Sequence, residues 1–70
     1  MSKKKVIELT SYNGRVILTK SDSILPIPLY NVYRMNVDGK VIEGKRRLTD
    51  FSMACVEFIK MSHRLLGFKY

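Results

Sequence analysis

The sequence predicts a small α+β domain, an antiparallel sheet of two β-hairpins (about four strands) packed against one C-terminal helix. Three observations lead to this prediction. The dipeptides Asn13-Gly14 and Asp38-Gly39 favour tight reversals, and each separates two runs rich in β-branched and aromatic residues. Apolar residues with helical spacing fill the last part of the chain. Because 70 residues suffice for only one domain, these elements must share a single core.

The first hairpin is predicted from residues 5–18, KVIELTSYNGRVIL. Asn-Gly is a preferred centre for a two-residue type I′ turn, because both positions need a positive φ. Counting outward from this turn places Ser11 opposite Val16 and Leu9 opposite Leu18. One face then carries mainly apolar side chains and the other mainly polar ones, as in a half-buried hairpin. The apolar face consists of Ile7, Leu9, Val16 and Leu18.

Residues 20–29, KSDSILPIPL, interrupt the strand pattern. Two prolines at alternate positions cannot both serve a central strand, so this segment is predicted to be a loop or an edge segment. Its apolar side chains, Ile24, Leu25 and Ile27, are expected to cover part of the core.

The second hairpin is predicted from the strand character of Leu29–Val37 and from Asp38-Gly39, a second type I′ signal. Counting from this turn places Met35 opposite Ile42. The same register pairs Arg34 with Glu43 across the strands, on the other face.

A helix is predicted over residues 49–66, with Thr49 as N-cap, Asp50 in the first turn and Gly67 as the C′ stop. Its apolar stripe comprises Phe51, Cys55, Phe58, Ile59, Leu65 and Leu66.

Self-association is suggested by apolar helix residues outside this stripe, namely Met53, Val56 and Met61. One small sheet covers only one side of a helix, so another surface must cover the remainder. An exposed edge strand at Leu29–Val37 would offer a second route to pairing. Both features favour a homodimer over a monomer.

The single domain, residues 1–70, divides by composition into a flexible basic arm (1–5), the sheet (6–47), the helix (49–66) and a tail (67–70). No apolar region of signal-peptide length follows the basic start. No run of about 18 apolar residues occurs, so we expect no transmembrane segment and a cytoplasmic location.

The order of these motifs resembles the small FlbD-type flagellar proteins. The resemblance rests on VIELTSYNGRVIL (6–18), SDSIL (21–25), the hairpin VDGKVI (37–42) and the amphipathic helix, and it covers roughly residues 6–66. The order is also similar to the DNA-binding module of LytTR response regulators. These likenesses imply a topology of two hairpins followed by one helix. The Leu25–Pro28 insertion and the basic run Gly44–Arg47 depart from the FlbD pattern.

Net charge points to an acidic partner. Thirteen Lys and Arg against six Asp and Glu give +7, which favours nucleic acid, an anionic membrane or an acidic protein surface. Arg46 and Arg47 offer planar forks for phosphate oxygens. Aromatic residues beside basic ones on an exposed sheet face are typical of single-strand binders. The candidate binding residues are Lys3, Lys4, Lys5, Tyr12, Arg15, Arg34, Lys40, Lys45, Arg46 and Arg47.

Catalysis is not expected. Cys55 falls on the apolar helix stripe, and His63 lies two turns away on another side, so neither activates the other. One His and one Cys do not make a metal site. We therefore predict a protein that is not an enzyme, with no cofactor, no metal and no small-molecule substrate.

The leading functional prediction is a small basic binding protein that holds nucleic acid electrostatically through its basic sheet and loop face. The alternative is a protein-interaction module, an accessory or inhibitory factor (for instance one encoded by a phage), that docks on an acidic protein surface. An anionic membrane ranks third, because Glu57 interrupts the polar face of the helix.

Overall fold

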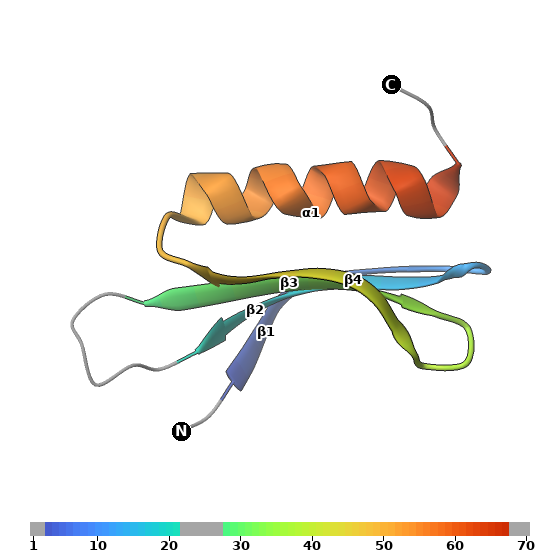
Figure 1. The fold of residues 1–70 in the computed structure, drawn as a ribbon, viewed down its shortest axis with the longest axis horizontal. Helices are drawn as coiled ribbons and strands as arrows, with labels where there is room; N and C mark the ends of the chain where they lie inside the picture. Colours follow the sequence, from blue (N-terminus) through green and yellow to red (C-terminus); the bar gives the residue numbers. More distant parts are fainter. Residues whose placement is uncertain (1–2, 22–27, 68–70) are drawn as a thin grey trace.

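The computed structural model describes residues 3–21 and 28–67, which form a four-stranded antiparallel sheet covered on one face by a helix (Figure 1). The strands follow chain order across the sheet, β1-β2-β3-β4. This arrangement confirms the predicted α+β fold of two hairpins and one C-terminal helix. The elements are β1 (Lys3–Ser11), β2 (Gly14–Ser21), β3 (Leu29–Asn36), β4 (Val41–Leu48) and α1 (Phe51–Leu66).

The first hairpin turns at Tyr12 and Asn13, because Ser11 pairs with Gly14 and Leu9 with Val16. The predicted register was therefore wrong by two residues. A shift of two keeps every side chain on its own face, so the predicted apolar face is unchanged. Val16, on that face, is fully buried.

Gly14 explains the shift, since it is needed inside β2 and not in the turn. Its φ is 137°, which disfavours other residues. A Cβ atom on Gly14 would lie only 2.0 Å from the carbonyl oxygen of Met35 on β3. The glycine thus permits the close approach of two backbones.

A two-residue turn at Asp38-Gly39 was predicted for the second hairpin. The hairpin instead closes through a longer loop that begins at Asn36. Gly39 donates its N–H to the carbonyl oxygen of Asn36 (3.0 Å) and has a φ of 85°. The N–H of Asn36 donates to the carbonyl oxygen of Lys40 at 2.9 Å. The Asn36 carboxamide oxygen accepts the N–H groups of Asp38 and Lys40, each at 3.0 Å. This side chain stabilises a longer loop.

Both outer strands carry irregularities. The predicted Arg34–Glu43 pair is confirmed, but the register shifts beyond it, so that Met35 pairs with Val41 and not with Ile42. A second shift in the β3–β4 ladder lies between Tyr30 and Val32, and β1 has one between Lys5 and Ile7.

β1 and β4 are the edges of the sheet, whereas β3 lies inside it between β2 and β4. The expectation of an edge strand at Leu29–Val37 was therefore wrong. Residues 22–27 lie outside the described residues, and with them the expected packing of Ile24, Leu25 and Ile27.

The N-cap of α1 lies one residue later than predicted. Asp50, not Thr49, is the N-cap, and its carboxylate accepts the N–H of Ser52 at 2.9 Å. Asp50 is extended, as an N-cap residue should be. The predicted stop is confirmed, because Gly67 has a φ of 84° and donates its N–H to the carbonyl oxygens of Arg64 and His63.

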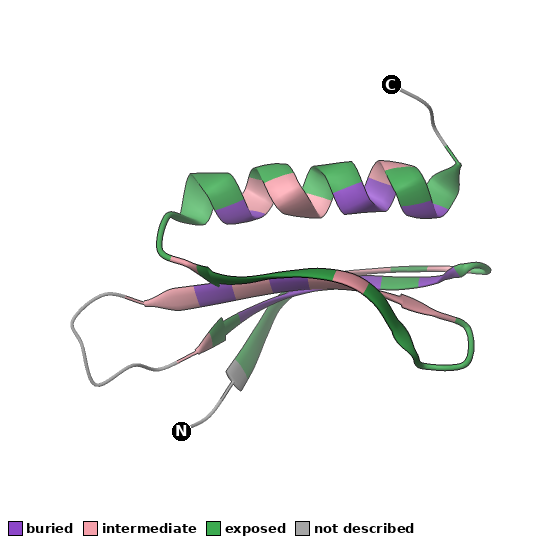
Figure 2. Cartoon of the chain, viewed as in Figure 1, coloured by how far each residue is buried: buried purple, intermediate pink, exposed green. Residues whose placement is uncertain are grey.

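The core lies between α1 and the face of the sheet that carries Val16 and Leu18 (Figure 2). Its helix residues differ in part from the predicted stripe. Met61, expected outside the stripe, is 1% exposed, whereas Ile59, expected inside it, is 51% exposed. Phe51 covers the side of Tyr30, with ring centroids 5.4 Å apart. The buried core residues are Val16, Leu18, Tyr30, Val32, Ala54, Met61 and Leu65.

Candidate nucleic-acid interface

Most carboxylates of the described chain already have a partner within the fold. Glu8 pairs with Lys5, Glu43 with Arg34 and Arg64, Glu57 with Lys60, and Asp50 caps α1. Within residues 3–21 and 28–67, this leaves exposed cations without an ion-pair partner. They are Lys4, Arg15, Lys20, Lys40, Lys45, Arg46 and Arg47.

Two of these cations, Lys4 and Lys20, stand directly opposite each other on β1 and β2. Like charges opposed across two strands destabilise a sheet. Lys3–Lys5 lie in β1, so the predicted flexible arm is wrong from Lys3 onward. Lys20 was not among the predicted binding residues.

The basic run of β4 lies at the same end of the sheet. Asn31 on β3 connects it to the end of β2, since its carboxamide accepts the N–H of Arg47 (3.4 Å) and donates to the hydroxyl of Ser21 (3.2 Å). Arg47 has a φ of 59°, at the irregular end of β4.

We call this region the basic end and define it by Lys4, Lys20, Lys45, Arg46 and Arg47. It includes the start of β1, the end of β2 and the end of β4, which lie at the same end of the sheet (Figure 1). Adjacent strands are about 4.8 Å apart, so the basic end spans roughly 14 Å from β1 to β4. This width suits several successive phosphates of a nucleic-acid strand.

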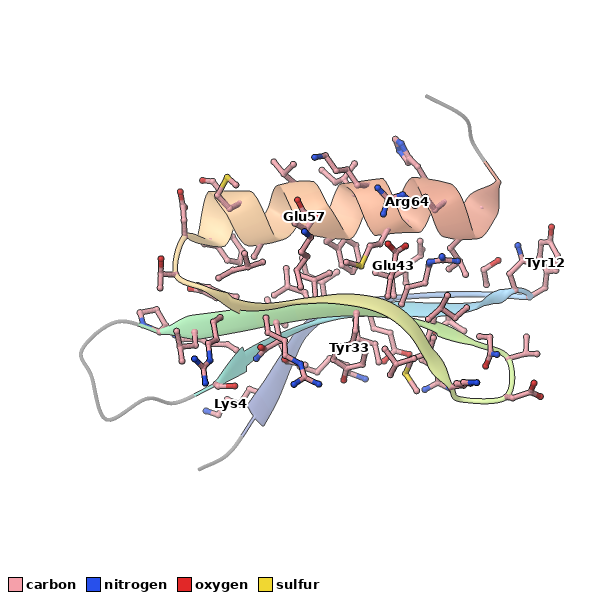
Figure 3. All side chains as sticks on the ribbon, in the orientation of Figure 1. Lys4, Tyr12, Tyr33, Glu43, Glu57 and Arg64 are labelled. Carbon is pink, nitrogen blue, oxygen red and sulfur yellow. The ribbon has the colours of Figure 1, made fainter. Side chains whose placement is uncertain are left out.

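A hollow of about 610 Å³ lies along β3 and β4. Tyr33 points away from α1, onto the uncovered face of the sheet (Figure 3). Gly44 sits opposite it on β4, and a Cβ atom there would lie 3.4 Å from the Cβ of Tyr33. The missing side chain leaves space beside the ring. The hollow is lined by Asn31, Val32, Tyr33, Val41, Ile42, Glu43, Gly44, Lys45 and Arg46.

The other predicted binding residues lie elsewhere. Arg34 has a side chain that is 20% exposed, and its Nε atom donates to Glu43 at 2.7 Å. Glu43 lies between the sheet and α1 (Figure 3). Tyr12 and Arg15 lie at the first hairpin tip, near the opposite end of β2, and Tyr12 is 85% exposed. Lys40 lies at the tip of the second hairpin, also away from the basic end.

Lys5 differs from its neighbours because it has a carboxylate partner. Its Nζ atom lies 2.7 Å from Glu8 on the same strand. The hydrogen bond from Lys5 is the main cause that lowers the pKa of Glu8 below its ordinary value, and a second one from Thr10 adds to it. Lys5 is therefore less available to an anion than Lys4.

No group of three His, Cys, Asp or Glu side chains that could hold a metal ion occurs in the described part of the chain. Cys55 is half-buried. Across residues 3–21 and 28–67, the sole helix is α1, and its 16 residues are too short and too polar for a membrane span.

No protein-family model, curated protein or solved structure matches this chain, so the resemblance to FlbD-type and LytTR proteins stays a prediction.

Proposed function

We propose that this protein binds nucleic acid through the basic end, without catalysing a reaction. The observation that carries the proposal is the opposition of Lys4 and Lys20, for neither of which residues 3–21 and 28–67 supply a carboxylate partner. The repulsion between these two ammonium groups lowers the stability of the sheet. A phosphate group placed between the two ammonium groups would turn this repulsion into attraction.

The basic run of β4 extends the same site. Arg46 and Arg47 supply fork-shaped donors that hold phosphate oxygens in two-point contacts. Each phosphate that the protein neutralises releases counterions, so affinity must fall steeply as salt rises. Contacts of this kind position a strand without reading its sequence.

The test uses two charge reversals at opposite ends of the sheet, Lys20→Glu and Lys40→Glu, titrated with a labelled oligonucleotide at several salt concentrations. Lys20→Glu should weaken binding and reduce the salt dependence, and it should also raise the stability of the fold, because it creates a pair with Lys4. Lys40→Glu changes the net charge equally but leaves the basic end intact, so it should weaken binding less. An equal loss of affinity in the two variants would contradict the proposal, and so would an affinity that does not change with salt concentration.

A protein with an acidic surface is the second candidate partner, favoured by the basic end together with exposed apolar side chains on α1. Met53, Val56 and Ile59 are 52%, 42% and 51% exposed. Capture of a stoichiometric protein from nuclease-treated cytoplasmic extract, lost in Lys20→Glu, would favour this candidate over nucleic acid. We retain the cytoplasm as the proposed location.

We also retain the homodimer as a proposal, with α1 as the contact. α1 carries Glu57 as well as Lys60 and Arg64, so it is much less basic than the sheet. Association through α1 would bury apolar surface while keeping two basic ends apart. Analytical ultracentrifugation of the natural chain and of Ile59→Glu tests this, and two identical monomer masses would exclude it.

A further inference from the structure

We infer that the hollow beside Tyr33 takes a single unstacked nucleobase, so that the ligand of this protein is single-stranded nucleic acid. This inference rests on the nucleic-acid binding proposed above and adds the class of nucleic acid. The juxtaposition that carries it is an aromatic ring, a missing side chain and a free arginine on adjacent strands.

The ring is that of Tyr33, which lies on the uncovered sheet face between Ile17 of β2 and Gly44 of β4. Tyr33 is half-buried although no helix covers it. Ile17 is 8% exposed, so the ring has an apolar support on one side. On the other side Gly44 has no side chain and leaves room for a flat ligand. Any nucleobase could stack there, since every base has a π-face.

The size and the lining of the hollow suit a nucleotide. About 610 Å³ lies within the range of about 300–1,000 Å³ typical of small-molecule sites. Asn31 supplies a carboxamide, and Arg46 supplies a guanidinium with no ion-pair partner in the described chain. A base stacked on Tyr33 would therefore have its phosphate near Arg46 and the rest of the strand toward the basic end.

Duplex nucleic acid cannot use this hollow, because its bases are stacked on one another and hide their faces. The shape of the sheet supports the same conclusion. The β3–β4 hairpin bends away from α1 (Figure 1), so the uncovered face is hollowed where Tyr33 lies. A flexible strand follows such a surface more readily than a rigid helix does.

The experiment compares a 12-nucleotide oligothymidine containing one 2-aminopurine with the matching duplex, at fixed salt, for five proteins. These are the natural chain and the variants Tyr33→Ala, Tyr33→Phe, Gly44→Val and Tyr12→Ala. Gly44 does not have a positive φ and is exposed, so valine at this position fills the hollow without backbone strain. Tyr12→Ala is the control for removing an exposed tyrosine far from the hollow. Circular dichroism and thermal unfolding report whether each variant folds.

We expect Tyr33→Ala and Gly44→Val to weaken single-strand binding roughly tenfold and to abolish the 2-aminopurine fluorescence change that reports stacking. Tyr33→Phe keeps the ring and should behave like the natural chain, as should Tyr12→Ala. Duplex binding should be weaker and insensitive to all four changes. If Tyr33→Ala does not fold, Gly44→Val alone decides.

Two outcomes would overturn the inference, and they are distinguishable. If single strands bind with normal salt dependence but Tyr33→Ala and Gly44→Val change nothing, the stacking site is wrong and the basic end stands. If neither single strand nor duplex binds at low salt, the proposed function fails and the inference fails with it.

Discussion

The carboxamide of Asn13 donates a hydrogen bond of 2.6 Å to the main-chain carbonyl oxygen of Leu65. This bond joins the tip of the first hairpin to the last turn of α1, across 52 positions of the chain. The last carbonyl groups of a helix lack partners within the helix, so the amide satisfies one of them.

Removal of this amide should destabilise the protein. Asn13→Ala is expected to lower the free energy of unfolding by about 1 kcal/mol, because it leaves the Leu65 carbonyl without this donor. Urea unfolding followed by circular dichroism measures the change. Tyr12→Ala alters the neighbouring turn residue, which is 85% exposed, and should shift stability by less than about 0.5 kcal/mol. Equal losses in both variants would mean that the turn, and not the bond to α1, is responsible.

Glu43 connects β3, β4 and α1 through two arginines. Its Oε1 atom lies 2.7 Å from Arg34, and its Oε2 atom lies 2.6 Å from Arg64 (Figure 3). Glu43→Ala leaves these guanidinium groups facing each other and should cost about 1–2 kcal/mol. Thermal unfolding at low and high salt tests this, with a larger loss at low salt.

The matched control for Glu43 is Glu57→Ala. Glu57 has a longer pair, 3.8 Å to the half-exposed Lys60 on the same helix. Such a pair contributes little, so the loss should stay below about 0.5 kcal/mol. A loss as large as that of Glu43→Ala would refute the connecting role of Glu43.

The pKa of Glu8 lies below its ordinary value, chiefly because Lys5 donates a hydrogen bond to it. Glu8 is thus deprotonated more readily in the folded than in the unfolded chain. Its contribution to stability is present above the unfolded pKa and is lost as pH falls through the folded pKa. Lys5→Met should raise the pKa of Glu8, as measured by carboxyl-carbon NMR titration. Lys60→Met, distant from Glu8, should leave that pKa unchanged.

Gly14 and Gly39 both have positive φ, but only Gly14 meets another backbone. Gly14→Ala should lower the free energy of unfolding by more than about 1 kcal/mol, because strain and a clash with Met35 add together. Gly39→Ala has nothing within 4 Å of the new methyl group and should cost less. Chemical unfolding of both variants tests the order, and a reversed order would show that the backbone contact at Gly14 is unimportant.

Sequence periodicity predicted the order of elements, the apolar face of the first hairpin and the pairing of Arg34 with Glu43. It failed where one residue had a role at long range. Asn-Gly suits a turn centre, and nothing local shows that Gly14 must instead make room for Met35 on a neighbouring strand. Asn36 similarly closed a longer loop than Asp38-Gly39 suggested, because its side chain replaces backbone hydrogen bonds.

The candidate site was predicted in part. Arg46 and Arg47 were expected from their adjacency and Lys4 from its charge, whereas Lys20 was missed because its importance depends on the register with Lys4. Tyr33 could be placed on the uncovered face only once the packing of α1 was known. Alternation shows that two faces exist, but the packing of α1 decides which one it covers.

The irregular registers of β1 and β4 have a consequence for behaviour at high concentration. Both outer strands break their ladder: β1 carries Lys5 at its break, and β4 carries Arg46 and Arg47 at one of its two breaks. Bulges and positive charge on outer strands hinder edge-to-edge growth into fibrils. The chain should therefore remain dispersed when concentrated, and a strong polyanion that masks these charges should promote aggregation instead.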